Sequence, residues 1–213
     1  MGRVNKMLER IVNYMKNKKL FQRQRTSPGT IALAVLIYHL GLSYRRASDI
    51  LRQFEPRSHE AVRKWYHRFK SLFPVIQRKK RRAIAIDETK IKLKGRWYYL
   101  WVAIDCDSYE VLAVYLSKAR SAFDALRFIR SALKYCDGKP YVYVDGGPWY
   151  RWPLQRLGLE WEHSTFGQRN PIEQWFSLLK HRIKRFYRRF PANALSLALS
   201  GCMAFIALKL MTC

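Results

Sequence analysis

Three carboxylates stand where a strand or a helix could hold them in a fixed position. Asp87 lies in the apolar stretch AIAIDETKIKL, Asp145 follows the apolar stretch YVYV, and Glu173 lies in RNPIEQWFSLLKHRIKRF. The chain around them is strongly basic, with 41 Lys and Arg residues against 15 Asp and Glu and a net charge of +26. A protein that binds a polyanion gains nothing electrostatically from converging acids. These three acids therefore predict a site for divalent metal ions that act on phosphate.

Two-metal chemistry explains why acids of this kind would converge. Two cations about 3.5–4 Å apart flank a phosphodiester, where one activates the attacking oxygen and the other stabilises the leaving oxygen. Mg²⁺ prefers hard oxygen ligands and keeps several waters, so a few carboxylates are enough to hold it. Asp87 and Asp145 would be neighbours if their strands pair, and Glu173 could come from a helix that crosses the sheet. These residues are the predicted catalytic residues and metal ligands.

Each acid also has a plainer interpretation. Asp145 precedes Gly-Gly and could simply form a turn, and Glu173 could cap its helix or interact with the helix dipole. Asp87 could keep a strand edge soluble, but an unpaired Asp in a buried strand is costly, which favours a functional role. Glu88 is the best alternative acid. Asp105 and Asp107 fit a turn better than a metal site.

The helix that carries Glu173 also carries lysines on the same face. Glu173, Lys180 and Lys184 fall at i, i+7 and i+11, which places them on one stripe of a helix. The acid would then face the metal ions, and the two lysines would face the DNA end held there.

The residues from 82 onward show the pattern of a mixed α/β domain, with apolar β-rich runs first and amphipathic helices between later strands. The order β-β-β-α-β-α-β-α is that of the RNase H-like fold, a mixed five-stranded sheet flanked by helices. The expected strands are 82–93, 96–104, 109–116, 141–144 and 158–163, and the expected helices are 121–135, 149–157 and 170–190.

The first part of the chain is predicted to be all helical. Ser27, Ser43 and Ser58 stand where they could cap helices over residues 31–40, over 44–54 and from residue 59 onward. The last two helices resemble a helix-turn-helix. Its second helix would place three basic residues near DNA, namely Arg63, Lys64 and Arg68. An ordinary helical hairpin with a charged, solvated face is the alternative.

We expect two domains, a helical DNA-binding domain over residues 1–77 and an RNase H-like catalytic domain over residues 78–213. The basic run RKKRR at 78–82 stands between them. It is interpreted as a linker, or as a lead-in to the first strand that lies on phosphate. Whether the first 25 residues form a dimerisation helix or a basic arm stays open.

Composition favours a folded, nucleic-acid-binding protein. Apolar residues make up 49% and aromatic residues 15% of the chain, which argues against a basic disordered protein. The charge favours nucleic acid over an anionic membrane or a ribosome-type structural role. The four cysteines form no C-x-x-C pair, which argues against zinc and against a disulfide framework. The start of the chain lacks an apolar signal core, and the uncharged stretch 192–208 is short for a membrane span and favours a buried helix. We therefore expect a cytoplasmic, nucleoid-associated protein.

The tryptophans are mostly expected in the core, and they are Trp97, Trp101, Trp149, Trp152 and Trp161. Two of them, Trp149 and Trp152, follow Asp145 closely. They could instead stack on an unpaired base at a DNA end.

The blocks around these residues resemble the DDE transposases and integrases, and more narrowly the insertion-sequence transposases of the "IS six" family. The resemblance covers residues 28–190 and is carried by SYRRASDIL, HEAVRKWYHRF, IDETKIKLKGRWYYLWVAIDCDS, YVDGGPWY and RNPIEQWFSLLKHRIKRF. It implies an RNase H-like catalytic domain with Mg²⁺ or Mn²⁺ and binding to terminal inverted repeats. It also implies 3′-end nicking and strand transfer to target DNA by an oligomeric protein–DNA complex.

One spacing departs from this resemblance. Between Asp145 and Glu173 stand 27 residues, fewer than is usual in the family. Two alternatives therefore stay open. One is a non-catalytic helix-turn-helix DNA-binding protein, such as a decayed or domesticated transposase, and the other is an RNase H-like nuclease without strand transfer.

Overall fold

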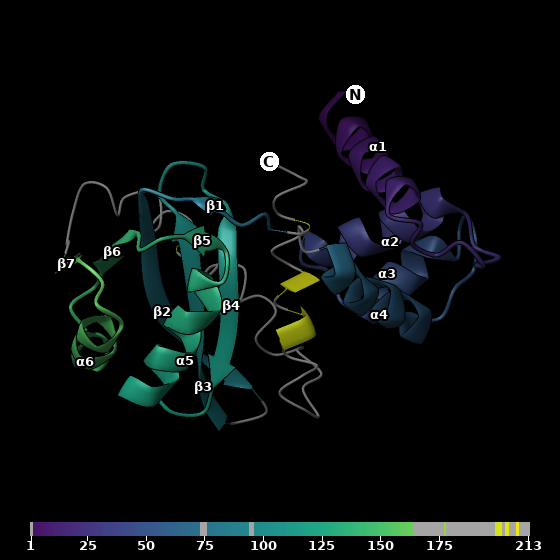
Figure 1. Cartoon of the computed structure of the whole chain (residues 1–213). Coiled ribbons are helices and arrows are strands. Elements are labelled where there is room, and N and C mark those ends of the chain that lie inside the picture. The colour runs from purple at the N-terminus through teal and green to yellow at the C-terminus, as the bar shows by residue number, and fades with distance from the viewer. Residues whose placement is uncertain are drawn as a thin grey trace. The chain divides into compact units, whose positions relative to one another are not determined.

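The computed structural model describes residues 2–72, 76–93 and 96–163, followed by residues 177, 199–201, 203, 204 and 208. The chain forms two compact units, Met1–Pro74 together with Ser196–Cys213, and Val75–Leu195. Figure 1 colours the N-terminal helices of the first unit purple to blue, its described residues near the C-terminus yellow, and the sheet of the second unit blue-teal to green. No helix in the described part of the chain is long and apolar enough to cross a membrane.

The first unit is helical, as predicted, and serine side chains cap three of its helices. The serine Oγ atoms accept hydrogen bonds from backbone N–H groups three residues further on, at 3.0 Å for Ser27, 3.1 Å for Ser43 and 3.2 Å for Ser58. The three predicted caps are confirmed, but the first capped helix begins at Pro28, before the predicted range 31–40, and the second ends at Leu51, before the predicted end at Phe54. The helices are α1 (Gly2–Asn17), α2 (Pro28–His39), α3 (Tyr44–Leu51) and α4 (His59–Arg68), with a 3₁₀ turn at Phe69–Leu72.

A cluster of tyrosines holds α2, α3 and α4 together. Tyr38 stacks on Tyr44 with ring centroids 3.8 Å apart, and Tyr66 meets Tyr38 edge-on at 4.5 Å. The edge-on arrangement is one that aromatic rings favour. The three helices therefore share one aromatic core.

The described residues near the C-terminus belong to the same unit. Ser200, Ala204 and Leu208 are helical and buried, and their spacing of four residues places them on one helix face. Ser200 Oγ donates a hydrogen bond to the backbone carbonyl of His67 in α4 at 3.3 Å. These positions agree with the prediction of a buried helix in the uncharged stretch 192–208.

The second unit is built around a mixed five-stranded sheet in the order β4-β3-β2-β6-β7. The first three strands form an antiparallel meander, and β6 and β7 extend the sheet from β2 in parallel. This is the topology of the RNase H-like fold that the order of elements predicted. The strands are β2 (Ala83–Leu93), β3 (Arg96–Asp105), β4 (Val111–Ser117), β6 (Tyr141–Val144) and β7 (Trp161–His163). Two short strands, β1 (Lys79–Lys80) and β5 (Cys136–Asp137), pair in parallel outside this sheet.

Two helices cover one face of the sheet, α5 (Ala122–Leu133) and α6 (Pro148–Leu157), and they pack against each other (Figure 1). Trp101 of β3 is fully buried beneath them. Its ring centroid lies 5.8 Å from that of Phe128 in α5 and 5.8 Å from that of Tyr150 in α6. Every residue of β2 from Ala83 to Thr89 is buried, as expected for a central strand covered on both faces.

The basic run before β2 corrects one expectation. The Arg81 side chain is completely buried, forms ion pairs with Asp105 and Glu110, and donates from Nε to the Tyr135 carbonyl at 2.9 Å. The interpretation of this run as a linker, or as a lead-in to the first strand that lies on phosphate, is therefore wrong for Arg81, because its guanidinium neutralises acids at the β3–β4 turn. The predicted turn role of Asp105 is confirmed, since its Oδ1 accepts a hydrogen bond from Asp107 N at 2.9 Å.

The tryptophans divide between the core and the surface. Trp101 lies in the core as predicted, and its Nε1 donates to Ser117 Oγ at 2.8 Å. Trp97 and Trp152 remain 49% and 41% exposed, so the prediction of a core position is wrong for both.

Candidate metal centre

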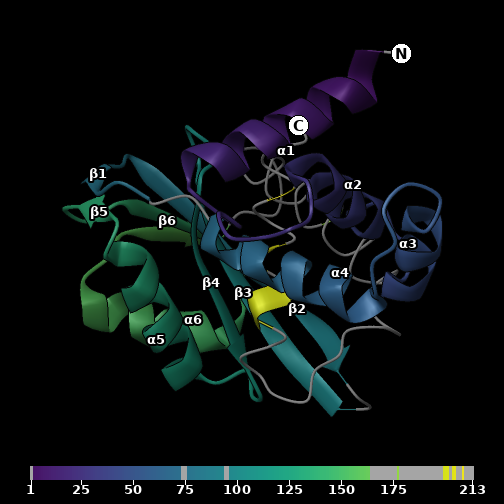
Figure 2. The same cartoon turned by 90° about the vertical axis from the view of Figure 1, so that its right-hand side faces the viewer.

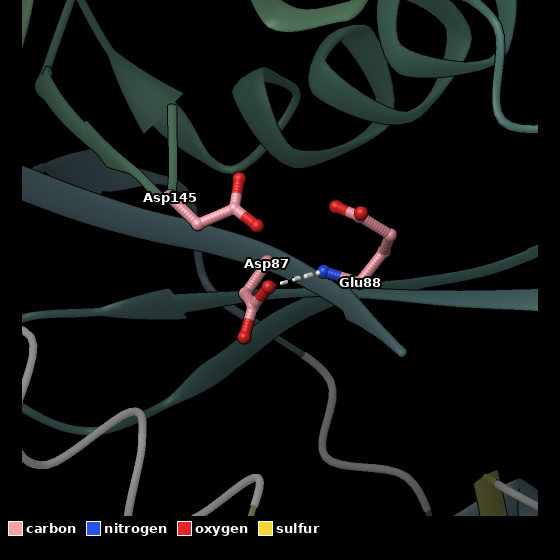
Figure 3. Close-up of side chains that lie close together, drawn as sticks. All are labelled: Asp87, Glu88 and Asp145. Carbon is pink, nitrogen blue, oxygen red and sulfur yellow. Dashed lines mark hydrogen bonds between the residues drawn. The ribbon is translucent and has the colours of Figure 1, made fainter. Parts of the chain in front are cut away.

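Strand pairing brings the first two predicted acids together. β2 and β6 run in parallel, with Ala83 opposite Tyr141 and Ala85 opposite Tyr143. Continuing this register by two residues places Asp145, which follows β6, opposite Asp87 in the middle of β2. The expectation that these strands are neighbours is confirmed, and Figure 3 shows how the two carboxylates lie.

The turn after β6 fixes the direction of the Asp145 carboxylate. Its Oδ1 accepts a hydrogen bond from the backbone N–H of Gly147 at 3.1 Å. Gly146 has a φ of +77°, in the left-handed region, and a Cβ there would come within 2.4 Å of the His163 ring. A side chain at this position would therefore displace the turn. Helix α6 begins directly after it, at Pro148.

Glu88 is a third acid at the same place. Neighbouring residues of a strand point to opposite faces, so Glu88 leaves β2 on the other side from Asp87 (Figure 3). Its carboxylate accepts a hydrogen bond from the hydroxyl of Tyr150, in the first turn of α6, and Arg120 Nη1 lies 3.3 Å from its Oε1. The Glu88 side chain is only 2% exposed.

The surroundings of Glu88 shift two pKa values. Burial raises the pKa of Glu88, and the hydrogen bond from Tyr150 opposes this rise. Burial and the charge of Glu88 raise the pKa of Tyr150 well above its usual value, so its hydroxyl stays protonated and acts as the donor.

Arg120 brings a positive charge to the edge of the site. Its guanidinium lies 3.7 Å from the centroid of the Trp149 ring and 5.3 Å from that of Tyr99, in cation–π geometry. These two rings and Glu88 together hold the guanidinium beside the acids. A fixed cation at this point reduces the repulsion between the carboxylates.

The three carboxylates have a spacing that suits a divalent cation. One oxygen each of Asp87, Glu88 and Asp145 lie within 4.8 Å of one another. Opposite ligands of an octahedral Mg²⁺ are about 4.2 Å apart, twice the metal–oxygen distance of about 2.1 Å. Neighbouring ligands of such an ion are about 3.0 Å apart, so the side chains would have to rotate inward on binding it. All three donors are the hard oxygens that Mg²⁺ prefers. Asp87 and Asp145 could therefore hold such an ion, with Glu88 beside them.

Three predicted site residues, Glu173, Lys180 and Lys184, lie outside the described residues. Within the described part of the chain, the third carboxylate of the cluster is Glu88, which the sequence analysis named as the alternative acid. Its partners Tyr150 and Arg120 were missed. The local sequence carries no signal for them, because only the packing of α6 and of the loop before α5 brings them to β2.

The predicted DNA-binding residues lie on α4. Lys64 and Arg68 are exposed and one helical turn apart, and the Arg68 guanidinium lies 5.2 Å from the ring centroid of Phe21. Arg63 is half-buried and forms an ion pair with Glu60, with Nη2 and Oε2 2.9 Å apart. The exposed face of α4 therefore presents Lys64 and Arg68, while Arg63 is held by a neighbouring acid.

An RNase H-like sheet that brings acids of two neighbouring strands together is the arrangement expected of a DDE-type domain. Residues 81–209 match the family DDE_Tnp_IS240, described as a DDE domain. The chain belongs to this family of DDE transposases, which confirms the resemblance to the insertion-sequence enzymes of the "IS six" family.

Relatives extend over different parts of the chain. An uncharacterized protein of Methanocaldococcus jannaschii is 48% identical over 187 residues, which cover 88% of this chain and 87% of that protein. The transposase for the insertion sequence-like element IS431mec of Staphylococcus aureus is 35% identical over 135 residues, or 60% of this chain. The alignment spans 59% of that transposase, less than two thirds of its length.

Among solved structures, the catalytic core domain of HTLV-2 integrase in complex with magnesium aligns with 60% of this chain and 85% of its own. The sequence identity is 20% and the TM-score is 0.44. A simian T-cell lymphotropic virus intasome in complex with a PP2A regulatory subunit aligns with 80% of this chain and 66% of the matched chain, at 17% identity and a TM-score of 0.47.

Proposed function

We propose that this protein is a DNA transposase that binds the terminal inverted repeats of an insertion element, nicks the phosphodiester bonds at its 3′ ends and transfers the freed strands to target DNA. Asp87, Asp145 and Glu173 are the proposed catalytic residues and the ligands of Mg²⁺ or Mn²⁺. A pair of cations bound there would supply activation of the attacking oxygen and stabilisation of the leaving oxygen.

The observation that carries this proposal is the register of β2 and β6 in a chain of the DDE family. That register places Asp145 opposite Asp87, and together with Glu88 their oxygens lie within 4.8 Å. Three carboxylates this close repel one another when ionised, and a divalent cation between them removes the repulsion. The Gly147 N–H holds Asp145 in place, so the ligand direction is set before DNA or metal binds.

DNA binding is assigned to both units. Arg63, Lys64 and Arg68 on α4 are proposed to contact the terminal repeat, as the second helix of a helix-turn-helix. Lys180 and Lys184 are proposed to position the DNA end beside the metal ions. Because transposition has to bring two element ends together, the active form is proposed to be a homo-oligomer, a dimer or larger, assembled on DNA.

The test is a nicking and strand-transfer assay on the element's own DNA ends, with and without Mg²⁺. Losing one metal ligand removes several kcal/mol of transition-state stabilisation, so Asp87→Asn and Asp145→Asn should each lower nicking by about three orders of magnitude. DNA binding should stay unchanged in both variants. Asp107→Asn is the matched control, because Asp107 lies in a surface turn and pairs with Arg82 at 2.7 Å.

The results separate the alternatives. Full Mg²⁺-dependent nicking by Asp145→Asn would show that the site is wrongly assigned. If the wild-type chain binds the DNA ends but cuts them neither with Mg²⁺ nor with Mn²⁺, the result would support the non-catalytic DNA-binding protein. Cut ends that are never joined to target DNA would support an RNase H-like nuclease.

A further inference from the structure

The far part of the β2–β3 hairpin carries a surface that the proposed chemistry does not use. In the described residues, β6 pairs with β2 from Ala83 to Ala85, and β4 pairs with β3 as far as Tyr99. Past these points β2 and β3 pair with each other, as in the pair Lys92 and Trp97. The hairpin therefore continues as a two-stranded ribbon past the five-stranded sheet (Figure 2).

One face of this ribbon alternates cations with aromatic rings. Strand periodicity puts Lys90 and Lys92 on the face of Glu88, and their partners across the hairpin are Tyr99 and Trp97. The ammonium groups of Lys90 and Lys92 lie 4.6 Å and 5.5 Å from the Trp97 ring centroid. Arg120, over Tyr99 and Trp149, joins this face to the acidic cluster. The basic–aromatic track consists of Lys90, Lys92, Trp97, Tyr99 and Arg120.

The track is exposed and uniform in charge. Trp97 is 49% exposed and Lys90 is exposed beside it. From residue 89 to residue 104 the sequence contains no Asp or Glu, so this stretch of the hairpin offers the two lysines no carboxylate partner. Cation–π contact with one ring restricts both ammonium groups and presents them side by side. Tryptophan is enriched at interfaces, and two cations in contact with an exposed Trp97 suit an anionic partner.

We propose that the basic–aromatic track binds the phosphate backbone of DNA beside the point of cutting, an inference that rests on the proposed transposase function. Lys90 and Lys92 stand two and four residues beyond Glu88, or about 7 and 14 Å along the strand at about 3.4 Å per residue. Each strand of duplex DNA has one phosphate per 3.4 Å of helix axis. DNA cut at the acidic cluster would therefore meet the lysines about two to four base pairs away. The net charge of +26 complements this partner.

Equilibrium binding of the full chain to a duplex with the element's end, measured by fluorescence anisotropy without divalent metal, tests the track. Lys90→Gln/Lys92→Gln should weaken binding roughly tenfold to a hundredfold near 0.1 M salt. It should also reduce the slope of log affinity against log salt by about 2, since each lost phosphate contact contributes about 0.9. Lys134→Gln/Lys139→Gln is the matched control, because it removes the same charge from exposed positions of the same unit.

Two further measurements localise the effect. Uncharged methylphosphonate linkages about two to four base pairs from the cut should weaken wild-type binding and leave the Lys90/Lys92 variant unaffected. Trp97→Ala should weaken binding about two- to fivefold through loss of the cation–π contacts, and Trp97→Phe should restore most of it. Circular dichroism of each variant verifies that the chain is folded.

The proposal would be overturned if the two double variants lost the same amount of DNA affinity. It would also be overturned if methylphosphonate linkages weakened binding equally in the wild type and in the Lys90/Lys92 variant. A third contrary result would be that Lys90→Gln/Lys92→Gln weakens binding to phosphatidylserine vesicles and leaves the affinity for DNA unchanged. A failure of the proposed transposase function would be detected in a different assay, the nicking assay. If Asp145→Asn still nicks DNA, the catalytic assignment fails, while the metal-free binding data still decide the track.

Discussion

Removing one hydroxyl group tests how the acidic cluster is anchored to α6. Tyr150→Phe keeps the aromatic ring against Trp101, where the ring centroids are 5.8 Å apart, and deletes the donor to Glu88. Tyr150 is 0% exposed and the Glu88 side chain is 2% exposed, so solvent does not readily replace the lost donor. Arg120 Nη1, at 3.3 Å, stays as a partner of the carboxylate.

The magnitude follows from the charge of the acceptor. A hydrogen bond to a charged group contributes about 1.5–3 kcal/mol, against about 0.5–1.5 kcal/mol between neutral groups. Tyr150→Phe should therefore lower the free energy of unfolding by about 1.5–3 kcal/mol. At about 2–4 °C per kcal/mol for a chain of this size, Tm should fall by roughly 3–12 °C. In a Glu88→Gln background the same substitution should cost only about 0.5–1.5 kcal/mol, because the acceptor is neutral.

The assay is chemical and thermal denaturation at neutral pH without divalent metal, arranged as a double-mutant cycle. Tyr115→Phe is the control, since Tyr115 donates to Asp124 Oδ1 at 3.3 Å in a partly exposed position, and its loss should cost no more than about 0.5 kcal/mol. A Tyr150→Phe cost equal to that of the control would refute the reasoning. If Tyr150→Phe lowered the free energy of unfolding equally with Glu and with Gln at position 88, the conclusion that Tyr150 donates to a charged acceptor would be refuted.

Two other predictions concern stability. Burial alone would raise the pKa of Asp105, but the Asp107 backbone N–H and the Arg81 guanidinium outweigh it and lower the pKa below its usual value. This stabilisation is present above the unfolded pKa of about 3.9 and is lost as the pH falls through the folded one. Asp105→Asn should therefore flatten the acid limb of the stability–pH curve and cost about 3–5 kcal/mol at neutral pH, and an acid limb that stays as steep would contradict this. Ser58→Ala should cost about 1 kcal/mol in urea unfolding through loss of the α4 cap, and Ser58→Gly only a few tenths, so equal costs would contradict the capping role.

Features that depend on neighbours within one turn could be predicted from the sequence. Ser27, Ser43 and Ser58 marked helix starts, because a cap needs only the serine and the backbone N–H groups just after it. The strand Tyr141–Val144 was predicted with its observed bounds, because turn signals flank a short apolar run. The pairing of the strands that carry Asp87 and Asp145 followed from the order of elements, since the RNase H-like topology makes those strands neighbours.

Features that depend on distant partners could not be predicted. Arg81 stands in a run of cations that locally indicates a solvated segment, yet its acidic partners Asp105 and Glu110 are 24 and 29 residues away. Trp97 is a large aromatic residue of the kind expected in a core. It is nevertheless exposed, because it lies in the part of the hairpin beyond Tyr99, where β4 no longer pairs with β3. In both cases the environment is set by how far one strand extends relative to another, which no local pattern contains.

Strand β2 combines three tasks because alternate residues serve opposite faces. Asp87 leaves one face and meets Asp145, whose position depends on the turn that leads into α6. Glu88 leaves the other face and fastens the first turn of α6 through Tyr150, so a shift of that helix would move Asp145 as well. The face of Glu88 continues outward to Lys90, where the proposed DNA surface begins. The spacing between metal ligand, helix anchor and DNA contact is therefore fixed by the rise of one strand, which is stiffer than any loop could make it.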